Sequence, residues 1–338
     1  MLNFHKDHQK LVITALLVYA ALSIIIAVVP ARQLQNVEPL PAQDALTDAE
    51  LKGLHIYVKE NCMACHTQQV RNIAMDKVWG DRPSMPSDYF YSKQRLSGWQ
   101  QSASLLGSER TGPDLTNAGI RQSGKDWHLL HFYNPRIVVK ESIMPGYPWL
   151  YREKEESEIT ADDTVVPVPQ QFLRNRNTKV VATKEVLQLI SYVQTLKQAP
   201  IPEASTAAFI ESPEQKLAEG QTGIAPVADP ATGKKLYMQN CGACHQETGK
   251  GLAGAFPPLA GSPIVNNNDP DFMVRVILQG YDARSEYGQM PGFAAQLSDE
   301  EISAIANHER SSWGNHATVV SAEDVKKIRD AVMRELNP

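Results

Sequence analysis

Two copies of the pattern Cys-x-x-Cys-His constrain this chain more than any other feature. The first runs from Cys62 to His66 and the second from Cys241 to His245. On a helix, such a string presents two thiols and one imidazole on one face. These groups suit two thioether bonds to haem vinyl groups and one iron ligand. We therefore expect two covalently bound haem c groups, and the residues that would hold them are Cys62, Cys65, His66, Cys241, Cys244 and His245.

The competing interpretations of a Cys-x-x-Cys string are a thiol redox pair and half of a zinc site. The matched surroundings of the two strings favour haem instead. Gly53 and Tyr57 precede the first string, and Gly233 and Tyr237 precede the second at the same spacing. An asparagine also stands directly before the first cysteine of each string. This internal repeat predicts two copies of one haem-binding unit.

Each histidine leaves one axial position on its iron, and methionine fills that position in electron-transfer cytochromes. Met144 and Met290 both stand directly before Pro-Gly. The proline favours an extended backbone and the glycine permits a tight turn, so both segments suit a loop across a haem face. We expect these methionines to be the second iron ligands. The rival ligands lie in segments with helical periodicity, where packing is the expected role, and they are His128, His131 and Met273.

Proline-flanked loops follow both strings and predict how each histidine is oriented. They lie at 112–115 and at 257–259. A ligating histidine normally donates its other ring N–H to a carbonyl group. We expect the carbonyl groups of Pro113 and Pro258 to accept these hydrogen bonds.

The segment from Leu11 to Val29 contains no charged residue. Its nineteen residues would span about 28 Å as a helix, which is close to the hydrocarbon thickness of a bilayer. A cleaved signal peptide is the alternative, although the apolar core of such peptides is usually shorter. Lys6 and Lys10 precede the segment and only Arg32 follows closely, which places the N-terminus in the cytoplasm. We expect a single-pass anchor in a bacterial inner membrane, with the haem domains in the periplasm.

Composition argues against a nucleic-acid partner. The formal net charge is −5, and no basic run exceeds two residues. Hydrophobic residues make up 42% of the chain and charged residues 21%, which is ordinary for a globular protein.

Local patterns predict where the parts of the chain begin and end. Thr47 with Glu50, and Ser298 with Glu301, each read as a capping box that opens a helix. Helical periodicity also predicts a closing helix at 184–197 and a final helix at 322–336. The expected parts are an anchor at 1–30, a spacer at 31–46, a first domain at 47–199 with an acidic surface insertion at about 151–176, a linker at 200–228 and a second domain at 229–338.

The first 200 residues resemble the membrane-anchored monohaem cytochrome c subunit (subunit II) of cbb(3)-type haem-copper oxidases. The stretches that carry the resemblance are 53–71, 110–115, 127–136 and 141–149, of which Trp-His-Leu-Leu-His-Phe-Tyr-Asn-Pro-Arg at 127–136 is the most specific. Residues 229–338 resemble a generic small class I cytochrome c, which the usual monohaem subunit lacks, and the insertion is a second departure. The implied fold is mostly α, with one N-terminal transmembrane helix followed by two class I cytochrome c domains. The resemblance also implies that His66 and Met144 are the axial ligands of the first haem.

The resemblance implies an electron-transfer subunit that has no catalytic residues of its own. It would take electrons from a soluble periplasmic donor, such as a small cytochrome c, and pass them to a haem-copper catalytic subunit that reduces oxygen. The alternatives in the same class are the cytochrome subunit of a nitric oxide reductase and that of a periplasmic dehydrogenase. A dihaem peroxidase needs an open haem position, which two Met-Pro-Gly loops disfavour. A binding module without haem is the remaining alternative.

Overall fold

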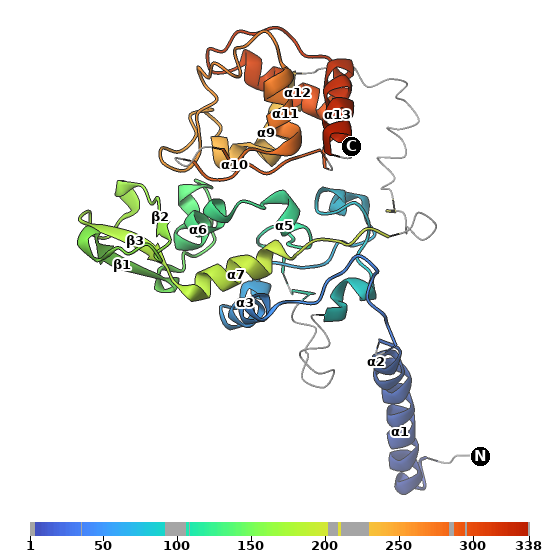
Figure 1. Cartoon of the computed structure of the whole chain (residues 1–338). Coiled ribbons are helices and arrows are strands. Elements are labelled where there is room, and N and C mark those ends of the chain that lie inside the picture. Colours follow the sequence, from blue (N-terminus) through green and yellow to red (C-terminus); the bar gives the residue numbers. More distant parts are fainter. Residues whose placement is uncertain are drawn as a thin grey trace. The chain divides into compact units, whose positions relative to one another are not determined.

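The structure of this chain is a computed structural model, which describes residues 4–34, 36–91, 106–107, 109–201, 209–210, 230–283, 287–294 and 296–336. It is mostly helical (Figure 1), as the sequence predicts. Two compact units are distinguished by their internal contacts. The first unit comprises Met1–Thr47, Asn61–Thr116 and Gln198–Glu211, and the second comprises Asp48–Glu60, Asn117–Lys197 and Ser212–Pro338. The expected division into domains at 47–199 and 229–338 stays a prediction.

The N-terminal part of the first unit is a long apolar helix. It consists of α1 (His8–Ser23), a π-helical turn (Ile24–Val28) and α2 (Val29–Leu34). The wider turn directly precedes Pro30, which lacks a backbone N–H, and the Val29 N–H donates to the Ile24 carbonyl five residues back. The helix thus runs beyond Pro30, so the expected spacer begins as helix. Residues His8–Val28 are long and apolar enough to cross a membrane, and within the described residues no other helix is.

The described remainder of the first unit consists mostly of loops and short 3₁₀ helices, and part of the expected linker lies against it. Arg82 donates a hydrogen bond to the Ala199 carbonyl at 3.0 Å. Ile210 forms a parallel β-bridge with Ile73, and the Ile210 N–H donates to the Asn72 carbonyl at 2.7 Å. The chain is therefore attached to the first unit at both 199 and 210. Most of the expected linker, including 211–228, lies outside the described residues.

In the second unit, α3 (Asp48–Lys59) packs against α7 (Lys184–Gln194). α3 begins directly after Thr47 and α7 begins at Lys184, both as predicted, although α7 ends three residues earlier than expected. A Cβ atom at Gly53 would lie 2.0 Å from the Gln188 carbonyl oxygen, so only glycine permits this approach of the two helices. Tyr57 then packs its ring edge-on to Tyr192, with 5.4 Å between ring centroids.

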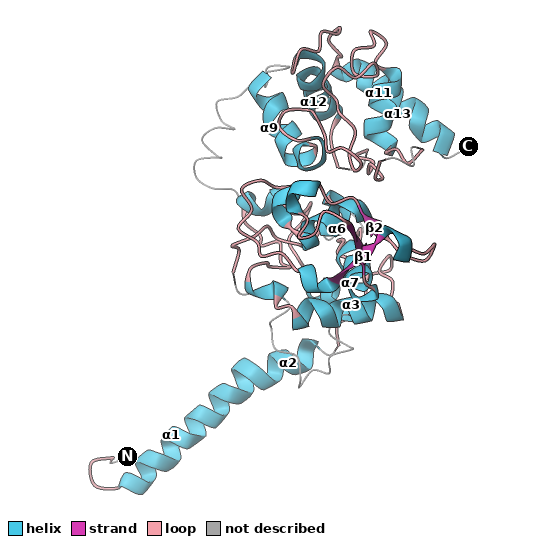
Figure 2. Cartoon of the chain, turned by 90° about the vertical axis from the view of Figure 1, so that its left-hand side faces the viewer, coloured by secondary structure: helices cyan, strands magenta, loops and turns pink. Residues whose placement is uncertain are grey.

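The insertion contains a small antiparallel sheet, which appears in magenta in Figure 2. The strands β1 (Tyr151–Glu155), β2 (Val165–Val166) and β3 (Thr178–Ala182) lie in the order β1-β3-β2. The sequence analysis expected only an acidic surface segment here. The sheet was missed because β1 carries alternating charges and exposes most of its side chains. The buried valines lie on the short strand β2 and on β3, and all of β3 lies beyond the expected insertion.

Several short helices and turns connect these elements. The helices are α5 (Ala118–Arg121) and α6 (Lys125–Tyr133), and the 3₁₀ turns are at Cys62–Ala64, Ala74–Val78, Pro86–Tyr89, Pro135–Ile137, Pro148–Leu150, Glu156–Glu158 and Gln170–Phe172. Many turns and short helices between 67 and 150 agree with the prediction for this region.

The C-terminal part of the second unit repeats the helix contact made by α3 and α7. Its helices are α9 (Pro230–Asn240), α10 (Gly242–His245), α11 (Asp271–Gln279), α12 (Asp299–Ser311) and α13 (Ala322–Leu336). A Cβ atom at Gly233 would lie 2.4 Å from the Ala304 carbonyl oxygen, and the Tyr237 ring packs against His308. The two Gly-x-x-x-Tyr segments of the sequence repeat therefore serve the same purpose, since each joins a first helix to a closing helix.

The ends of the last two helices agree with the sequence analysis. Ser298 caps α12 by accepting a hydrogen bond from the Glu301 N–H, and the Glu301 carboxylate accepts one from the Ser298 N–H at 2.9 Å. The predicted capping box is confirmed. α13 has the predicted bounds, and its apolar face is buried at Val325, Ile328 and Val332.

Candidate functional site

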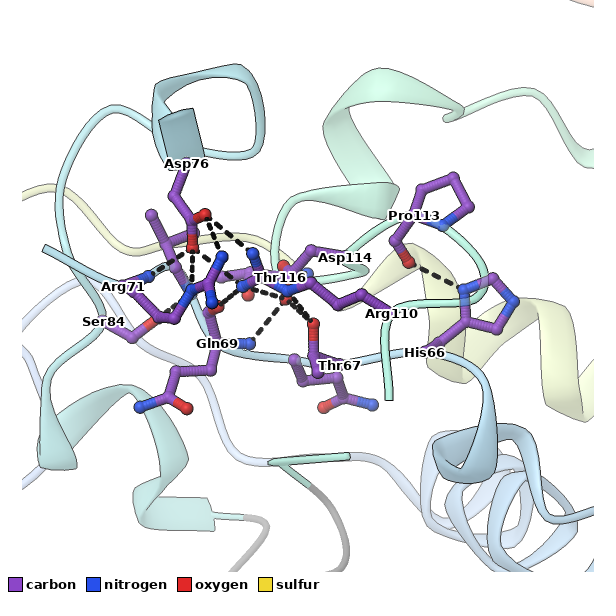
Figure 3. Close-up of polar contacts among 12 residues, drawn as sticks. His66, Thr67, Gln69, Arg71, Asp76, Ser84, Arg110, Pro113, Asp114 and Thr116 are labelled. Carbon is purple, nitrogen blue, oxygen red and sulfur yellow. Dashed lines mark hydrogen bonds and ion pairs between the residues drawn. The ribbon is translucent and has the colours of Figure 1, made fainter. Parts of the chain in front are cut away.

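The loop at 110–116 holds the imidazole of His66 (Figure 3). The Pro113 carbonyl oxygen lies 2.7 Å from His66 Nδ1, as the sequence predicted. Because a carbonyl can only accept, Nδ1 carries the proton and Nε2 keeps a lone pair for a metal. A Cβ atom at Gly112 would lie 2.2 Å from His66 Cε1, so this loop can approach the ring only with glycine at that position.

Several further hydrogen bonds join the same loop to residues 65–69. The Gly112 N–H donates to the Cys65 carbonyl and the Leu115 N–H to the Thr67 carbonyl, each at 2.8 Å. The buried Asp114 carboxylate accepts from the Thr67 hydroxyl and from the Gln69 N–H. Residues 65–69 are therefore held both by backbone hydrogen bonds and by the Asp114 side chain.

Met144 belongs to the second unit, so its pairing with His66 stays a prediction. It lies outside regular secondary structure and is partly buried. Its backbone is held locally, because Arg136 donates to its carbonyl at 3.3 Å and its N–H donates to the Ser142 hydroxyl at 3.3 Å. This is the loop conformation that the Met-Pro-Gly pattern predicted.

The second string lies beside a cavity of about 390 Å³ with a mainly apolar lining. Cys241, His245 and Met290 all line this cavity, so the structure brings three of the four predicted residues together, whereas Cys244 is not among the lining residues. Met290 is fixed there by two backbone hydrogen bonds with Tyr281, at 2.9 and 3.0 Å. An apolar cavity between an imidazole and a thioether is what a haem requires, and its donor set fits that group.

The carbonyl that accepts from His245 is one residue away from the one predicted. His245 Nδ1 lies 3.0 Å from the Pro257 oxygen, whereas the sequence analysis named Pro258. Two adjacent prolines follow this string, and residue types alone do not say which carbonyl faces the ring. Burial lowers the pKa of His245, so its imidazole is neutral at physiological pH and Nε2 is available as a ligand.

Burial also makes the cysteines of the second string unlike redox-active thiols. It raises the pKa of Cys241, and it raises the pKa of Cys244 to about 12. Reactive Cys-x-x-Cys pairs instead have a lowered thiol pKa. The zinc interpretation is also unsupported, because the described residues contain no cluster of three His, Cys, Asp or Glu side chains that could hold a metal ion. Both observations favour the haem interpretation.

The rival ligands pack in helices, as predicted. His128 is buried in α6, its Nε2 lies 2.6 Å from the Gln122 carbonyl, and burial lowers its pKa to about 4. His131 stacks on Trp127 with 4.3 Å between ring centroids. Met273 also lines the cavity, but its sulfur lies 4.0 Å from an Arg310 nitrogen, which favours Met290 as the ligand.

Sequence analysis missed a buried acid in the cavity beside the second string. Glu309 lines the cavity, is 5% exposed, and has its pKa raised to about 8 by burial. Its position in α12 reads as an ordinary helical glutamate, so no sequence signal identified it. Arg110 and Asp76, which lie beside the His66 loop, were also missed.

Comparisons with known proteins agree with this chemistry. The family described as "Cytochrome C oxidase, mono-heme subunit/FixO" matches residues 3–171, and "Cytochrome C oxidase, cbb3-type, subunit III" matches residues 228–308. The chain is 40% identical over 113 residues to cytochrome c-552 of Thermus thermophilus, which covers 29% of this chain and 85% of that protein.

Cytochrome subunits of dehydrogenases are also similar. The chain is 33% identical over 160 residues to the cytochrome c subunit of the quinone-dependent alcohol dehydrogenase of Gluconacetobacter polyoxogenes, which covers 46% of this chain. It is 32% identical over 108 residues to the gluconate 2-dehydrogenase cytochrome c subunit of Pantoea cypripedii, covering 30% of this chain and 24% of that protein. The chain spans about a third of the length of the alcohol dehydrogenase subunit.

Proposed function

The chain belongs to the FixO family of mono-haem cytochrome c oxidase subunits, and on this basis we propose that it is a membrane-anchored dihaem electron-transfer subunit of a cbb(3)-type oxidase. The observation that supports this most is the shared arrangement of the two strings. In each, a histidine donates Nδ1–H to a proline carbonyl and leaves Nε2 for iron. When bound, each haem c supplies a one-electron carrier.

The residues of the chain would bind and orient these carriers. Cys62 and Cys65 would attach the first haem, and Cys241 and Cys244 the second. His66 with Met144, and His245 with Met290, would fill both axial positions of each iron. With both positions filled by protein, oxygen would be reduced in the partner subunit and not in this chain.

The apolar N-terminal helix supports attachment to a membrane. We propose that it spans the bacterial inner membrane once and leaves both haem domains in the periplasm, because Lys6 and Lys10 precede the span. Alkaline carbonate should leave the protein in the membrane fraction. A mature N-terminus near residue 31 would instead identify a signal peptide.

We place the haem of the first string next to the catalytic subunit and the haem of the second string next to the donor. The FixO match covers the anchor and the first string, whereas the second string lies in the part that matches the family described as "Cytochrome C oxidase, cbb3-type, subunit III". The donor would be a soluble periplasmic carrier such as a small cytochrome c.

Purification of the complex in mild detergent tests the proposal. We expect two haem c groups per chain in the pyridine haemochrome spectrum, and about half that content after Cys62→Ala with Cys65→Ala. We also expect a co-purifying membrane subunit that contains copper and haem and reduces oxygen.

The similarity to dehydrogenase subunits makes a periplasmic dehydrogenase the second candidate. Co-purification with a dehydrogenase and without copper would favour it. Nitric oxide consumption by the purified complex, without oxygen consumption, would point to the nitric oxide reductase alternative.

A further inference from the structure

Arg110 uses its guanidinium group to join two parts of the first unit (Figure 3). On one side, its Nε donates to the Thr67 hydroxyl at 2.8 Å, and a terminal nitrogen donates to the Gln69 carbonyl. On the other side, its two terminal nitrogens contact both oxygens of Asp76, at 2.7 and 2.8 Å. The segment that directly follows His66 is therefore connected to a buried carboxylate.

Asp76 is the fixed point of this arrangement. Its side chain is fully buried, and Arg71 also donates to it, from the backbone at 2.8 Å and from the side chain at 2.9 and 3.1 Å. Burial by itself raises the pKa of Asp76, but the hydrogen bonds from Arg110 and Arg71 outweigh it and hold this pKa well below its usual range. Asp76 is thus a carboxylate at neutral pH, and separating it from Arg110 is costly because a buried charge would lose one of its two arginine partners.

Asp114 binds the same segment, and its carboxylate also lies 3.5 Å from a terminal nitrogen of Arg110. It accepts hydrogen bonds from the Thr67 hydroxyl, the Gln69 N–H and the Thr116 N–H. Arg110 and Asp114 thus lie on either side of Gly112 and Pro113, and the Pro113 carbonyl accepts a hydrogen bond from His66 Nδ1–H. Thr67 bonds to both of them, so any movement of Arg110 is transmitted to the residue next to the histidine.

We infer that Arg110 is a positioning residue for the proximal histidine of the first haem, acting through Thr67 and Gln69 with Asp76 as its anchor. The inference rests on the proposed function, since it needs a haem at His66. A short Nδ1–H···O=C bond makes an imidazole a stronger electron donor to its metal, which favours the oxidised iron. Loosening the 65–69 segment weakens that bond, so the reduction potential of the first haem rises.

The test compares two charge-conserving variants of the full-length protein. Arg110→Lys keeps the positive charge but loses the planar fork that reaches Asp76, Thr67 and Gln69 together. We expect a higher potential for the first haem in a spectroelectrochemical titration, with the second haem unchanged as the internal reference. Arg71→Lys is the matched control, because Arg71 bonds to Asp76 but makes no hydrogen bond to residues 66–69 among the described contacts. It should leave both potentials unchanged.

A second pair of variants tests the Thr67 hydroxyl, which accepts a hydrogen bond from Arg110 and donates one to Asp114. Thr67→Val loses the hydroxyl that joins Arg110 to Asp114 and should raise the reduction potential of the first haem. Thr67→Ser keeps the hydroxyl and should have the wild-type potential. This pair decides the question if Arg110→Lys does not acquire its first haem. An unchanged or lower potential in haem-loaded Arg110→Lys or Thr67→Val overturns the inference. Absence of haem at His66 in the wild-type protein would instead overturn the proposed function.

Discussion

Glu309 is a buried acid that lines the cavity beside the second string. Its carboxyl group is neutral at pH 7, because burial raises its pKa to about 8. The folded state therefore holds a proton that the unfolded state releases above pH 4.5. The stability associated with this proton is fully present below about pH 4.5 and is lost as the pH rises through about 8.

We predict that Glu309→Gln removes this pH dependence. Between pH 5 and pH 8 the variant should become progressively more stable than the wild type, by up to about 1.4 kcal/mol per pH unit. Urea denaturation of the haem-loaded protein at several pH values measures this difference. Glu323→Gln, at an exposed position of α13, is the control and should show no such trend. A constant difference between Glu309→Gln and wild type across this range would contradict the prediction.

Gly112 offers a second test at the residue scale, since any side chain there meets the His66 ring. We predict that Gly112→Ala lowers the occupancy of the first haem, toward one haem per chain, as measured by haem content and by the mass of the peptide that contains Cys62 and Cys65. Gly242→Ala is the control and should retain two haems, because its Cβ would approach the flexible Met238 side chain at 3.2 Å and meet the Tyr237 carbonyl oxygen only at an ordinary 3.6 Å. Two haems with an unchanged spectrum in Gly112→Ala would show that the loop can move away.

The site residues divide into those that sequence reveals and those that it does not. Sequence identified the Cys-x-x-Cys-His strings and the Ser298 cap, because each depends on residues close in sequence. It also identified the Pro113 carbonyl, because that residue lies in a turn with few possible conformations. Arg110 and Asp76 are 34 positions apart, and no periodicity links them. The choice between Pro257 and Pro258 depended on a backbone direction that residue types do not encode.

At the scale of elements, α3 with α7 and α9 with α12 make the same kind of contact between a first helix and a closing helix. The Gly-x-x-x-Tyr repeat was visible in the sequence, but its role was not, because the closing helix lies far along the chain. The helices α7, α12 and α13 were predicted well because their periodicity and caps are local. The sheet of β1, β2 and β3 was missed because its strands are short and the exposed side chains of β1 are charged.

We predict that Gly53→Ala destabilises the protein by about 1–3 kcal/mol, because its methyl group would overlap the Gln188 carbonyl and force α3 away from α7. Thermal or urea denaturation measures the loss. Lys52→Ala, at the exposed neighbouring position of the same helix, is the control and should change stability by less than about 0.5 kcal/mol. Equal stabilities for the two variants would mean that the helices can separate without cost.

At the scale of the whole molecule, the proposed direction of electron flow can be tested by shortening the chain. The contacts at Ala199 and Ile210 attach the chain to the first unit, so a protein that ends after residue 211 keeps both. We predict that it still assembles with the catalytic subunit but accepts electrons more slowly from the natural donor, since the second haem is absent. Oxygen consumption with that donor, and with a small artificial reductant, measures the difference. A full rate with the natural donor would reverse the proposed order.

The contact between first and closing helices also bears on how the chain folds. Gly53 meets Gln188 across 135 positions of sequence, whereas Gly233 meets Ala304 across 71. Bringing the ends of the longer loop together costs about 0.6 kcal/mol more entropy, because the closure cost rises by this amount for each doubling of loop length. Contacts between distant residues also slow folding. We therefore expect α9 and α12 to close their contact sooner than α3 and α7, although α9 and α12 are synthesised last.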